Sequence, residues 1–400
     1  MKELVFKCFG FCYFIVVTRL IKVQHYIYIN LPFIPNQMIT IVGAGPAGSY
    51  LGYLLAKQGK DVTIIEEHDT VGKPVQCTGI VTHSIEKFFK LKNEVIAKRL
   101  NKVIVVSKNN RISVSLDEIV MWRDKFDQFV AGMAVKAGAK ILTNHKFIGF
   151  NGKNSVKAKD MKNDRMKNLK SEIIVGADGP YSAVAKAAGI DSNSKNYIGM
   201  QAKVKVDMDT ESFETYFGSD FPNFFGWCVP ESEDTARLGI GCFENTQHNF
   251  YKFLVKRTGK KDVICWESGL IPLYNPKKLI QKGNVYLIGD AAGQVKATTG
   301  GGIIPSLKAA QTLCGCIISS KDYNKEFKKN SGKELLLHLR IRNILNKFSD
   351  ADYDKLLNLM SQEKVRKIFK KYDRDTPVPL VANLLLKEPR FLLFSKILFS

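Results

Sequence analysis

Residues 39–66 read ITIVGAGPAGSYLGYLLAKQGKDVTIIE, and this stretch decides the fold. Ile39–Val42 is a short apolar strand, and Pro46–Lys57 has the pattern of a helix that tolerates proline in its first turn. Asp61–Glu66 is a second strand. The GxGxxG loop between strand and helix permits a tight turn, a close approach of the backbone to a pyrophosphate, and close packing of the helix. The pattern predicts a βαβ unit that binds a dinucleotide.

This unit supplies the first candidate cofactor contacts, which are Gly43, Gly45 and Gly48 in the loop and Glu66 at the end of the second strand. The start of the helix offers free backbone N–H groups and a positive potential to phosphate. The Glu66 carboxylate is placed to accept hydrogen bonds from ribose hydroxyls. This unit does not distinguish NAD from FAD.

Two later segments repeat the order of strand, acidic turn and helix start. The first is VGADGPYS at 175–182, which contains Asp178. The second is LIGDAAG at 287–293, which contains Asp290 and is followed by TTGGGI at 298–303. An Asp at a strand end can accept from ribityl hydroxyls while glycine-rich backbone N–H groups meet phosphate or flavin. The second interpretation of each segment alone is a turn with a helix cap.

The sequence order of these three motifs resembles that of the FAD-dependent oxidoreductases of the p-hydroxybenzoate hydroxylase superfamily. Within it, residues 38–400 resemble the geranylgeranyl reductase family, including its archaeal digeranylgeranylglycerophospholipid reductases. The narrower resemblance rests on GKPVQCTGI at 72–80, FGWCVP at 225–230, and the whole segment 289–303. Phe225 and Val229 replace a Tyr and a Phe of the family motif, which removes one hydroxyl and some bulk from the expected pocket.

The resemblance implies that FAD is the cofactor and that no metal is required. It implies FAD contacts at Ala47, Glu66, Cys77, Thr78, Ile80, Arg123, Asp290, Gly302 and Ile303, and a backbone contact of Phe147 to the adenine end. It also implies a substrate pocket at Phe225, Trp227 and Pro230, with Cys77 and Trp227 as catalytic candidates. Cys77 is equally interpreted as a small inert apolar residue, and Trp227 as part of a core.

The implied reaction is the saturation of isolated C=C bonds in geranylgeranyl chains, on archaeal-type membrane glycerophospholipid precursors. Hydride from reduced flavin N5 has to be matched by proton delivery, and an aromatic wall of Phe224, Phe225 and Trp227 suits any cationic character that develops. The alternative is an FAD-dependent aromatic or polyprenyl-quinone monooxygenase. The external electron donor, NAD(P)H or a protein such as ferredoxin, stays open.

Charge and cysteine content set expectations about location. The 60 Lys and Arg against 38 Asp and Glu give a net charge of +22, which favours anionic partners or reflects a basic proteome. No nucleic-acid-binding motif is present, and eight Cys without a CxxC pair are typical of a reducing cytoplasm. Residues 320–400 carry 18 Lys and Arg against 10 Asp and Glu, so they either contact the inner face of the membrane peripherally or form a solvated face. Lys296 is expected to be solvated, with contact to a lipid phosphate as the second interpretation.

The expected fold class is α/β, α+β overall, with a Rossmann-like FAD-binding domain, an inserted antiparallel-sheet substrate domain and a C-terminal helical region. The expected domains are an extension at 1–37, a discontinuous FAD-binding domain at 38–190 and 275–330, a sheet domain at 191–274 and helices at 331–400. We expect translation to start at Met38. We also expect a solvated hairpin loop at 151–170 and no long helix within 195–274.

Overall fold

The computed structural model describes residues 37–190 and 195–398. The chain divides into a unit of residues 1–37 and a unit of residues 38–400. The expected N-terminal extension therefore lies outside the described residues, except for Gln37. Everything below concerns the second unit.

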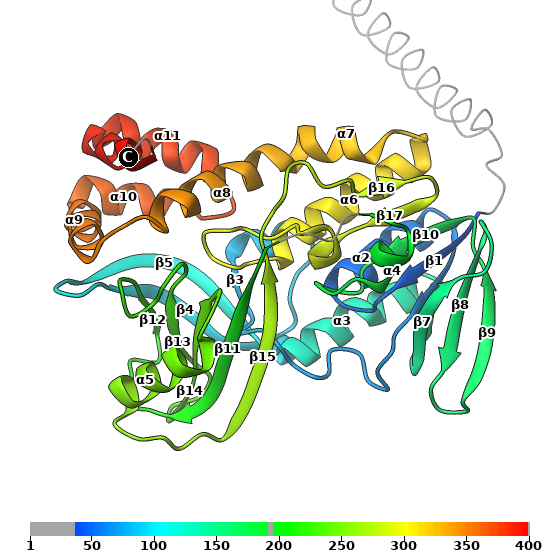
Figure 1. Ribbon diagram of the computed structural model, residues 1–400, viewed down its shortest axis with the longest axis horizontal. Coiled ribbons are helices and arrows are strands. Elements are labelled where there is room, and N and C mark those ends of the chain that lie inside the picture. Colours follow the sequence, from blue (N-terminus) through cyan, green and yellow to red (C-terminus); the bar gives the residue numbers. More distant parts are fainter. Residues whose placement is uncertain (1–36, 191–194, 399–400) are drawn as a thin grey trace, which may run out of the picture. The chain divides into compact units, whose positions relative to one another are not determined.

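A six-stranded sheet contains the predicted dinucleotide-binding unit (Figure 1). Its order is β16-β17-β10-β1-β2-β6, and all its pairs are parallel except β16 with β17. Both faces are covered, so the inner strands are continuous apolar runs rather than alternating ones. The strands are β1 (Met38–Val42), β2 (Asp61–Ile65), β6 (Lys140–Leu142), β10 (Ile173–Gly176), β16 (Gln281–Lys282) and β17 (Val285–Leu287).

Helices pack on this sheet as the sequence predicts. Helix α2 (Pro46–Lys57) has the predicted bounds, and Gly59 follows it in the left-handed region with a φ of 73°. It packs against α3 (Arg123–Lys136) and α6 (Ile303–Ser319), while the short α4 (Ala183–Ala187) follows β10. The predicted βαβ unit is confirmed.

An eight-stranded sheet has the order β15-β11-β14-β13-β12-β4-β5-β3, antiparallel except for the parallel pair β4 and β12. Its strands are β3 (Ile80–Thr82), β4 (Ile96–Val106), β5 (Arg111–Met121), β11 (Asn196–Lys205), β12 (Ser212–Tyr216), β13 (Gly226–Pro230), β14 (Thr235–Cys242) and β15 (Cys265–Pro272). Strands β3, β4 and β5 come from residues 80–121, which lie within the expected FAD-binding domain. The β4–β12 pairing joins segments about a hundred residues apart, so local patterns do not reveal it.

One prediction for this region is wrong, because α5 (Thr246–Thr258) is a helix of 13 residues. Phe250, Phe253 and Leu254 have helical spacing and are buried against strands β11 and β14. The richness of the region in Phe concealed that periodicity.

A third sheet, β7-β8-β9, contains the segment expected to be a solvated hairpin loop. Its strands are β7 (His145–Phe150), β8 (Ser155–Asp160) and β9 (Arg165–Lys170). The hairpin is therefore confirmed, but most of it is strand rather than loop.

Helices complete the chain along the top of Figure 1. They are α7 (Tyr323–Phe327), a π-helical turn (Lys328–Gly332), α8 (Lys333–Leu345), α9 (Asp350–Met360), α10 (Glu363–Lys371) and α11 (Pro377–Lys387), followed by a 3-10 segment (Pro389–Leu398). Ser107 Oγ and Asn109 Nδ2 donate to the Asp354 carboxylate, which joins α9 to the large sheet. The predicted fold class is confirmed.

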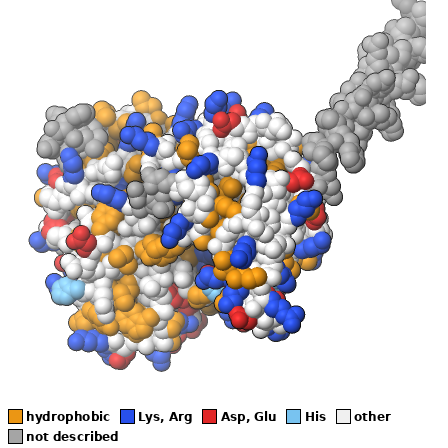
Figure 2. All heavy atoms as spheres, turned by 45° about the vertical axis from the view of Figure 1, so that its right-hand side comes forward, with side chains coloured by type: hydrophobic (Ala, Val, Ile, Leu, Met, Phe, Trp, Pro, Cys, Tyr) orange, Lys and Arg blue, Asp and Glu red, His pale blue; other side chains and the backbone are white. Residues whose placement is uncertain are grey.

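Two general properties follow from the described residues. None of their helices is long and apolar enough to cross a membrane. Figure 2 shows Lys and Arg side chains spread across the visible face rather than gathered at one point. The cationic side chains on that face are therefore distributed and do not form a single patch.

Candidate active site

A single large cavity of about 1370 Å³ joins the two larger sheets and the C-terminal helices. It exceeds the roughly 1000 Å³ upper range of ordinary small-molecule sites, so it has room for a dinucleotide and a second ligand. We call the region around the GxGxxG loop, Glu66, residues 72–80, Arg123 and Asp290 the cofactor part. We call the other region the apolar part, and it is lined by Val103, Val105, Val114, Phe213, Leu357, Met360 and Phe369.

The start of α2 forms one end of the cofactor part. Gly45 caps this helix with no side-chain hydrogen bond, so the first backbone N–H groups of the helix remain available to a ligand. A Cβ added to Gly45 would meet no protein atom, whereas one added to Gly43 would lie 2.3 Å from the Ala177 carbonyl oxygen. Gly45 thus borders open cavity, while Gly43 is required by packing and by its φ of 101°.

Glu66 lies beside this loop at the end of β2. Its carboxylate accepts from the Ala44 backbone N–H at 2.8 Å and from His68 Nδ1 at 2.7 Å. These contacts fix the carboxylate at the edge of the cavity, in the position from which a ribose can be bound.

The two acidic turns differ in what their carboxylates do. Asp178 accepts from Ser182 Oγ at 2.6 Å and from the Val184 N–H at 3.0 Å, so it caps α4, although it also lines the cavity. The Asp290 carboxylate accepts no hydrogen bond from any described residue, and burial raises its pKa to about 6. Asp290 is therefore the acidic turn whose carboxylate is available to a ligand.

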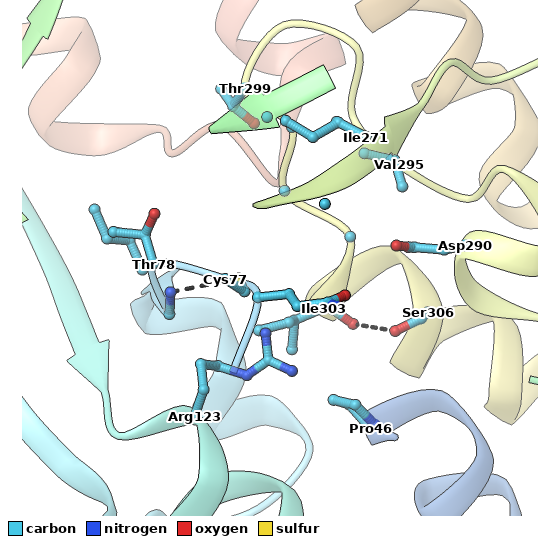
Figure 3. A pocket seen from close by; sticks show the side chains of 18 of the residues that line it. Pro46, Cys77, Thr78, Arg123, Ile271, Asp290, Val295, Thr299, Ile303 and Ser306 are labelled. Atoms are coloured by element: carbon cyan, nitrogen blue, oxygen red, sulfur yellow. Dashed lines mark hydrogen bonds between the residues drawn. The ribbon is translucent and has the colours of Figure 1, made fainter. Parts of the chain in front are cut away.

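Arg123 and Asp290 point into the cavity from opposite sides (Figure 3). Arg123 opens α3 and is paired with Asp127 one turn later, with Nη2 3.0 Å from Oδ1. The nearby carboxylate raises the pKa of Arg123 even though burial acts against it. A fixed cation therefore faces a carboxylate across the cofactor part.

A polar network holds the Cys77 loop against the large sheet. Gln201 Oε1 accepts from Thr78 Oγ1 at 2.8 Å and from Trp227 Nε1 at 3.1 Å. Arg237 donates to the Cys77 carbonyl oxygen at 3.0 Å and is itself paired with Glu231 and Glu267. The loop is thereby positioned by side chains on β11, β13, β14 and β15. The Cys77 thiol accepts from the Gly79 N–H at 3.4 Å and also interacts with the Arg123 guanidinium.

The aromatic wall is present, but a cation already occupies part of it. The Arg342 guanidinium lies 4.7 Å from the ring centre of Phe224 and 5.9 Å from that of Phe225. A second cation beside these two rings would be repelled by the first. Of the three expected wall residues, Trp227 remains the one suited to a developing positive charge.

The apolar part runs from this wall between the large sheet and helices α9 and α10. Leu357 and Val114 lie in one buried cluster, with Met360 and Phe369 packed against it. The exposed Lys370 and Lys371, at the end of α10, also line the cavity, and we call these two residues the basic mouth. An apolar channel with a basic mouth suits a long hydrocarbon carrying an anionic group.

Lys296 corrects one sequence interpretation, because it is not solvated. It is 4% exposed, and its Nζ lies 2.5 Å from Asp375 Oδ1, which also accepts through its other oxygen from Thr82. The pair joins the loop before α6 to the C-terminal region. No sequence motif links Lys296 to this partner, which lies 79 residues away.

The structure brings together all but two of the predicted site residues. Those lining the cavity are Gly43, Gly45, Ala47, Glu66, Cys77, Thr78, Ile80, Arg123, Phe147, Asp178, Phe225, Trp227, Asp290, Gly302 and Ile303. Gly48 packs against the Gly43 carbonyl instead. Pro230 is buried but does not line the cavity. Side chains point alternately to the two faces along β13, and those of Trp227 and Val229 point toward the cavity.

Sequence reasoning missed Gln201, Arg237, Glu267 and Arg342, and the lining residues from α9 and α10. No local motif marks them, since each acquires its place through strand pairing or helix docking. Within the described part of the chain, no group of three or more His, Cys, Asp or Glu side chains could hold a metal ion.

The residues fit FAD. The uncapped start of α2 beside the open space at Gly45 suits a pyrophosphate, and Glu66 suits the adjoining ribose. The unpartnered Asp290 suits the ribityl chain, and the second uncapped helix start, at Gly302 before α6, suits the flavin ring.

Comparisons with known proteins agree with an FAD-binding domain and with this fold. The sequence profile of the FAD binding domain family matches residues 36–261. Digeranylgeranylglycerophospholipid reductase from Methanosarcina acetivorans is 27% identical over 365 residues, covering 82% of this chain and 89% of that protein. The crystal structure of a geranylgeranyl bacteriochlorophyll reductase-like protein from Thermoplasma acidophilum has a TM-score of 0.77 at 23% identity, covering 90% of this chain and 99% of that one. A probable FAD-dependent monooxygenase from Pseudomonas aeruginosa has a TM-score of 0.60 at 15% identity, covering 80% and 99%.

Proposed function

The chain belongs to the FAD-binding domain family, and from this premise we propose that it is an FAD-dependent reductase of isolated C=C bonds in geranylgeranyl chains. The proposed substrates are membrane glycerophospholipid precursors of the archaeal type, in keeping with the names of its curated relatives. The observation that carries the proposal is the continuity of the cavity, in which the cofactor part opens directly onto the apolar part.

Bound FAD in its reduced form would supply the hydride. The chain's own contribution is to hold the alkene and exclude water. The apolar part accepts an isoprenoid chain by removing its surface from water, at roughly 25 cal/mol per Å². Trp227 presents an indole next to the Cys77 loop, and its N–H is fixed by Gln201. Catalytic roles for Cys77 and Trp227 remain part of this proposal.

The basic mouth extends the proposal to the substrate head group. Lys370 and Lys371 are exposed at the end of α10 and also line the cavity, whereas the nearby Arg374 is already paired with Glu118. A phosphate at the end of the hydrocarbon would meet these cations while the chain occupies the apolar part.

Peripheral contact with the cytoplasmic face of the membrane follows from the same substrate. On and after α11, Leu386 is 77% exposed and Leu393 is 57% exposed, with Lys387 and Arg390 between them. Exposed apolar side chains interleaved with cations are typical of interfacial segments. Leu386→Asp should reduce flotation with anionic vesicles, whereas Val135→Asp, at a 52% exposed position on α3, should not. Equal flotation of both variants and the native protein would remove this surface from the proposal.

The electron donor is proposed to be external, either NAD(P)H or a reduced electron-transfer protein such as ferredoxin. Anaerobic mixing of the oxidised holoenzyme with each donor separately would identify it through bleaching of the flavin absorbance. Donors that leave the flavin oxidised are thereby excluded.

The test of the proposed function uses the holoenzyme reduced anaerobically with dithionite, freed of excess reductant and given the geranylgeranylated lipid. Flavin absorbance should return in proportion to the lipid added. Met360→Asp places a charge in the apolar part and should abolish this response, whereas Leu359→Asp on the same helix should retain it, because Leu359 does not line the cavity.

Flavin that stays reduced in the native protein would contradict the proposal. Productive reaction of the reduced flavin with oxygen, stimulated by a phenol, would instead support the monooxygenase alternative.

A further inference from the structure

Arg342 on α8 is the largest fully buried side chain in the described part of the molecule, with an exposure of 0%. Its guanidinium donates to three backbone carbonyl oxygens, those of Ala297 at 3.0 Å, Phe224 at 3.2 Å and Thr298 at 2.6 Å. It also lies over the Phe224 ring. The arginine is therefore held firmly by hydrogen bonds and by an aromatic face.

No carboxylate compensates this charge. None of the ion pairs among residues 37–190 and 195–398 involves Arg342. Buried charges in proteins are ordinarily paired, and an arginine does not give up its proton. The site thus retains a net positive charge that only dipoles and π-electrons screen.

The charge lies directly behind the cavity wall. Two of the carbonyls it binds, those of Thr298 and Phe224, belong to residues that line the cavity. The loop at Thr298 continues into the glycine-rich start of α6 at Gly302, and the Phe224 ring lies against Gly300. The cofactor part and the aromatic wall meet at this place.

We propose that Arg342 is a positioning residue whose fixed charge raises the reduction potential of the bound flavin. When the oxidised ring takes two electrons from a reductant such as dithionite and one proton from water, it gains one net negative charge. A buried cation nearby stabilises that charge, and the start of α6 acts in the same direction. The inference rests on FAD binding and not on the proposed lipid substrate.

The magnitude follows from Coulomb's law. If the separation is taken as about 10 Å and the effective dielectric constant as about 20, two unit charges interact strongly enough to change an equilibrium constant roughly tenfold. For a two-electron couple, a tenfold change corresponds to about 30 mV.

The test compares three variants by equilibrating each holoenzyme with dyes of known potential, without lipid. Arg342→Gln should keep stoichiometric FAD but show a reduction equilibrium constant that is roughly tenfold smaller. Arg342→Lys keeps the positive charge and should shift the reduction potential less than Arg342→Gln does. Arg340→Gln removes an exposed arginine two residues away on the same helix and should behave as the native protein does. An unchanged potential in Arg342→Gln, or equal shifts in the Gln and Lys variants, would overturn the proposal.

A measurement on the native protein covers the case in which the Gln and Lys variants do not fold. If the reduced ring is held as an anion, the potential should fall by about 30 mV per pH unit between about pH 6 and 8, since one proton accompanies two electrons. A slope of about 59 mV, for two protons, would contradict an anion-stabilising charge. Free FAD measured alongside provides the reference. Because no lipid is present, a failed lipid reaction leaves this result unaffected.

Discussion

Replacing Gly45 by alanine should separate cofactor binding from folding. Gly45 has a φ of −65° and a ψ of −179°, which any residue adopts, and an added Cβ would meet no protein atom. Alanine gains about 0.4–1 kcal/mol through the unfolded state but is a poorer helix N-cap than glycine, so the stability of the FAD-free chain should change by less than about 1 kcal/mol. The same methyl group would occupy the space in which the backbone should approach the pyrophosphate.

The expected loss of FAD affinity can be bounded. Forcing an extra methyl group into a close contact costs about 1–3 kcal/mol, which is roughly a 5- to 150-fold increase in Kd. Gly43→Ala should behave differently, because its Cβ would lie 2.3 Å from the Ala177 carbonyl oxygen and its φ is 101°. That variant should lose both stability and FAD binding.

The assay is titration of the FAD-free protein with FAD, followed by flavin fluorescence, together with urea unfolding of the same FAD-free samples. Gly132→Ala in α3 is the matched control, because an added Cβ there also meets nothing within 4 Å and Gly132 does not line the cavity. It should leave Kd unchanged. Native-like FAD affinity in a folded Gly45→Ala variant would refute the assignment of this loop to the pyrophosphate.

Three further outcomes are expected. Lys296→Met should leave the buried Asp375 carboxylate without its cation and lower the free energy of unfolding by about 3–5 kcal/mol in urea titrations. Adding Asp375→Leu to this variant should restore part of the lost free energy of unfolding. The folded-state pKa of Asp290, about 6, exceeds the ordinary aspartate value of 3.8, so the FAD-free folded chain binds the extra proton. Its stability should therefore fall as pH rises between about 4 and 6, and Asp290→Asn should remove that slope and be more stable at pH 7 than the native chain. Trp227→Leu should slow alkene reduction by roughly 2- to 30-fold, because a cation–π contribution of about 0.5–2 kcal/mol is lost, and the variant should still bind stoichiometric FAD. An unchanged rate of alkene reduction would assign Trp227 to the core alone.

Local sequence patterns predict the cofactor part well. The loop at Gly43, helix α2 and Glu66 are contiguous within 28 residues, and their strand and helix periods are unambiguous. Asp290 follows the same logic at the end of β17. Asp178 shows the limit, because the sequence cannot tell whether a carboxylate at a strand end contacts a ligand or caps the next helix, and here its hydrogen bonds go to α4.

The remainder of the site depends on contacts between distant segments. Lys296 has the sequence context of a solvated residue, and only the docking of the C-terminal region brings Asp375 to it. Arg342 binds backbone carbonyl groups, which every residue carries, so no sequence pattern identifies its partners. The six-residue motif at 225–230 does not reveal that Pro230 points away from the cavity, because strand alternation turns only every second side chain toward it.

The central claim, that this flavoprotein saturates geranylgeranyl chains, is tested most directly by mass spectrometry of the lipid. The holoenzyme is reduced anaerobically with dithionite and incubated with digeranylgeranylglycerophospholipid, with Met360→Asp as the inactive control. We expect the lipid mass to rise in steps of one hydrogen pair, up to the number of bonds reduced. A lipid whose mass is unchanged in the presence of fully reduced, FAD-loaded enzyme would contradict the account.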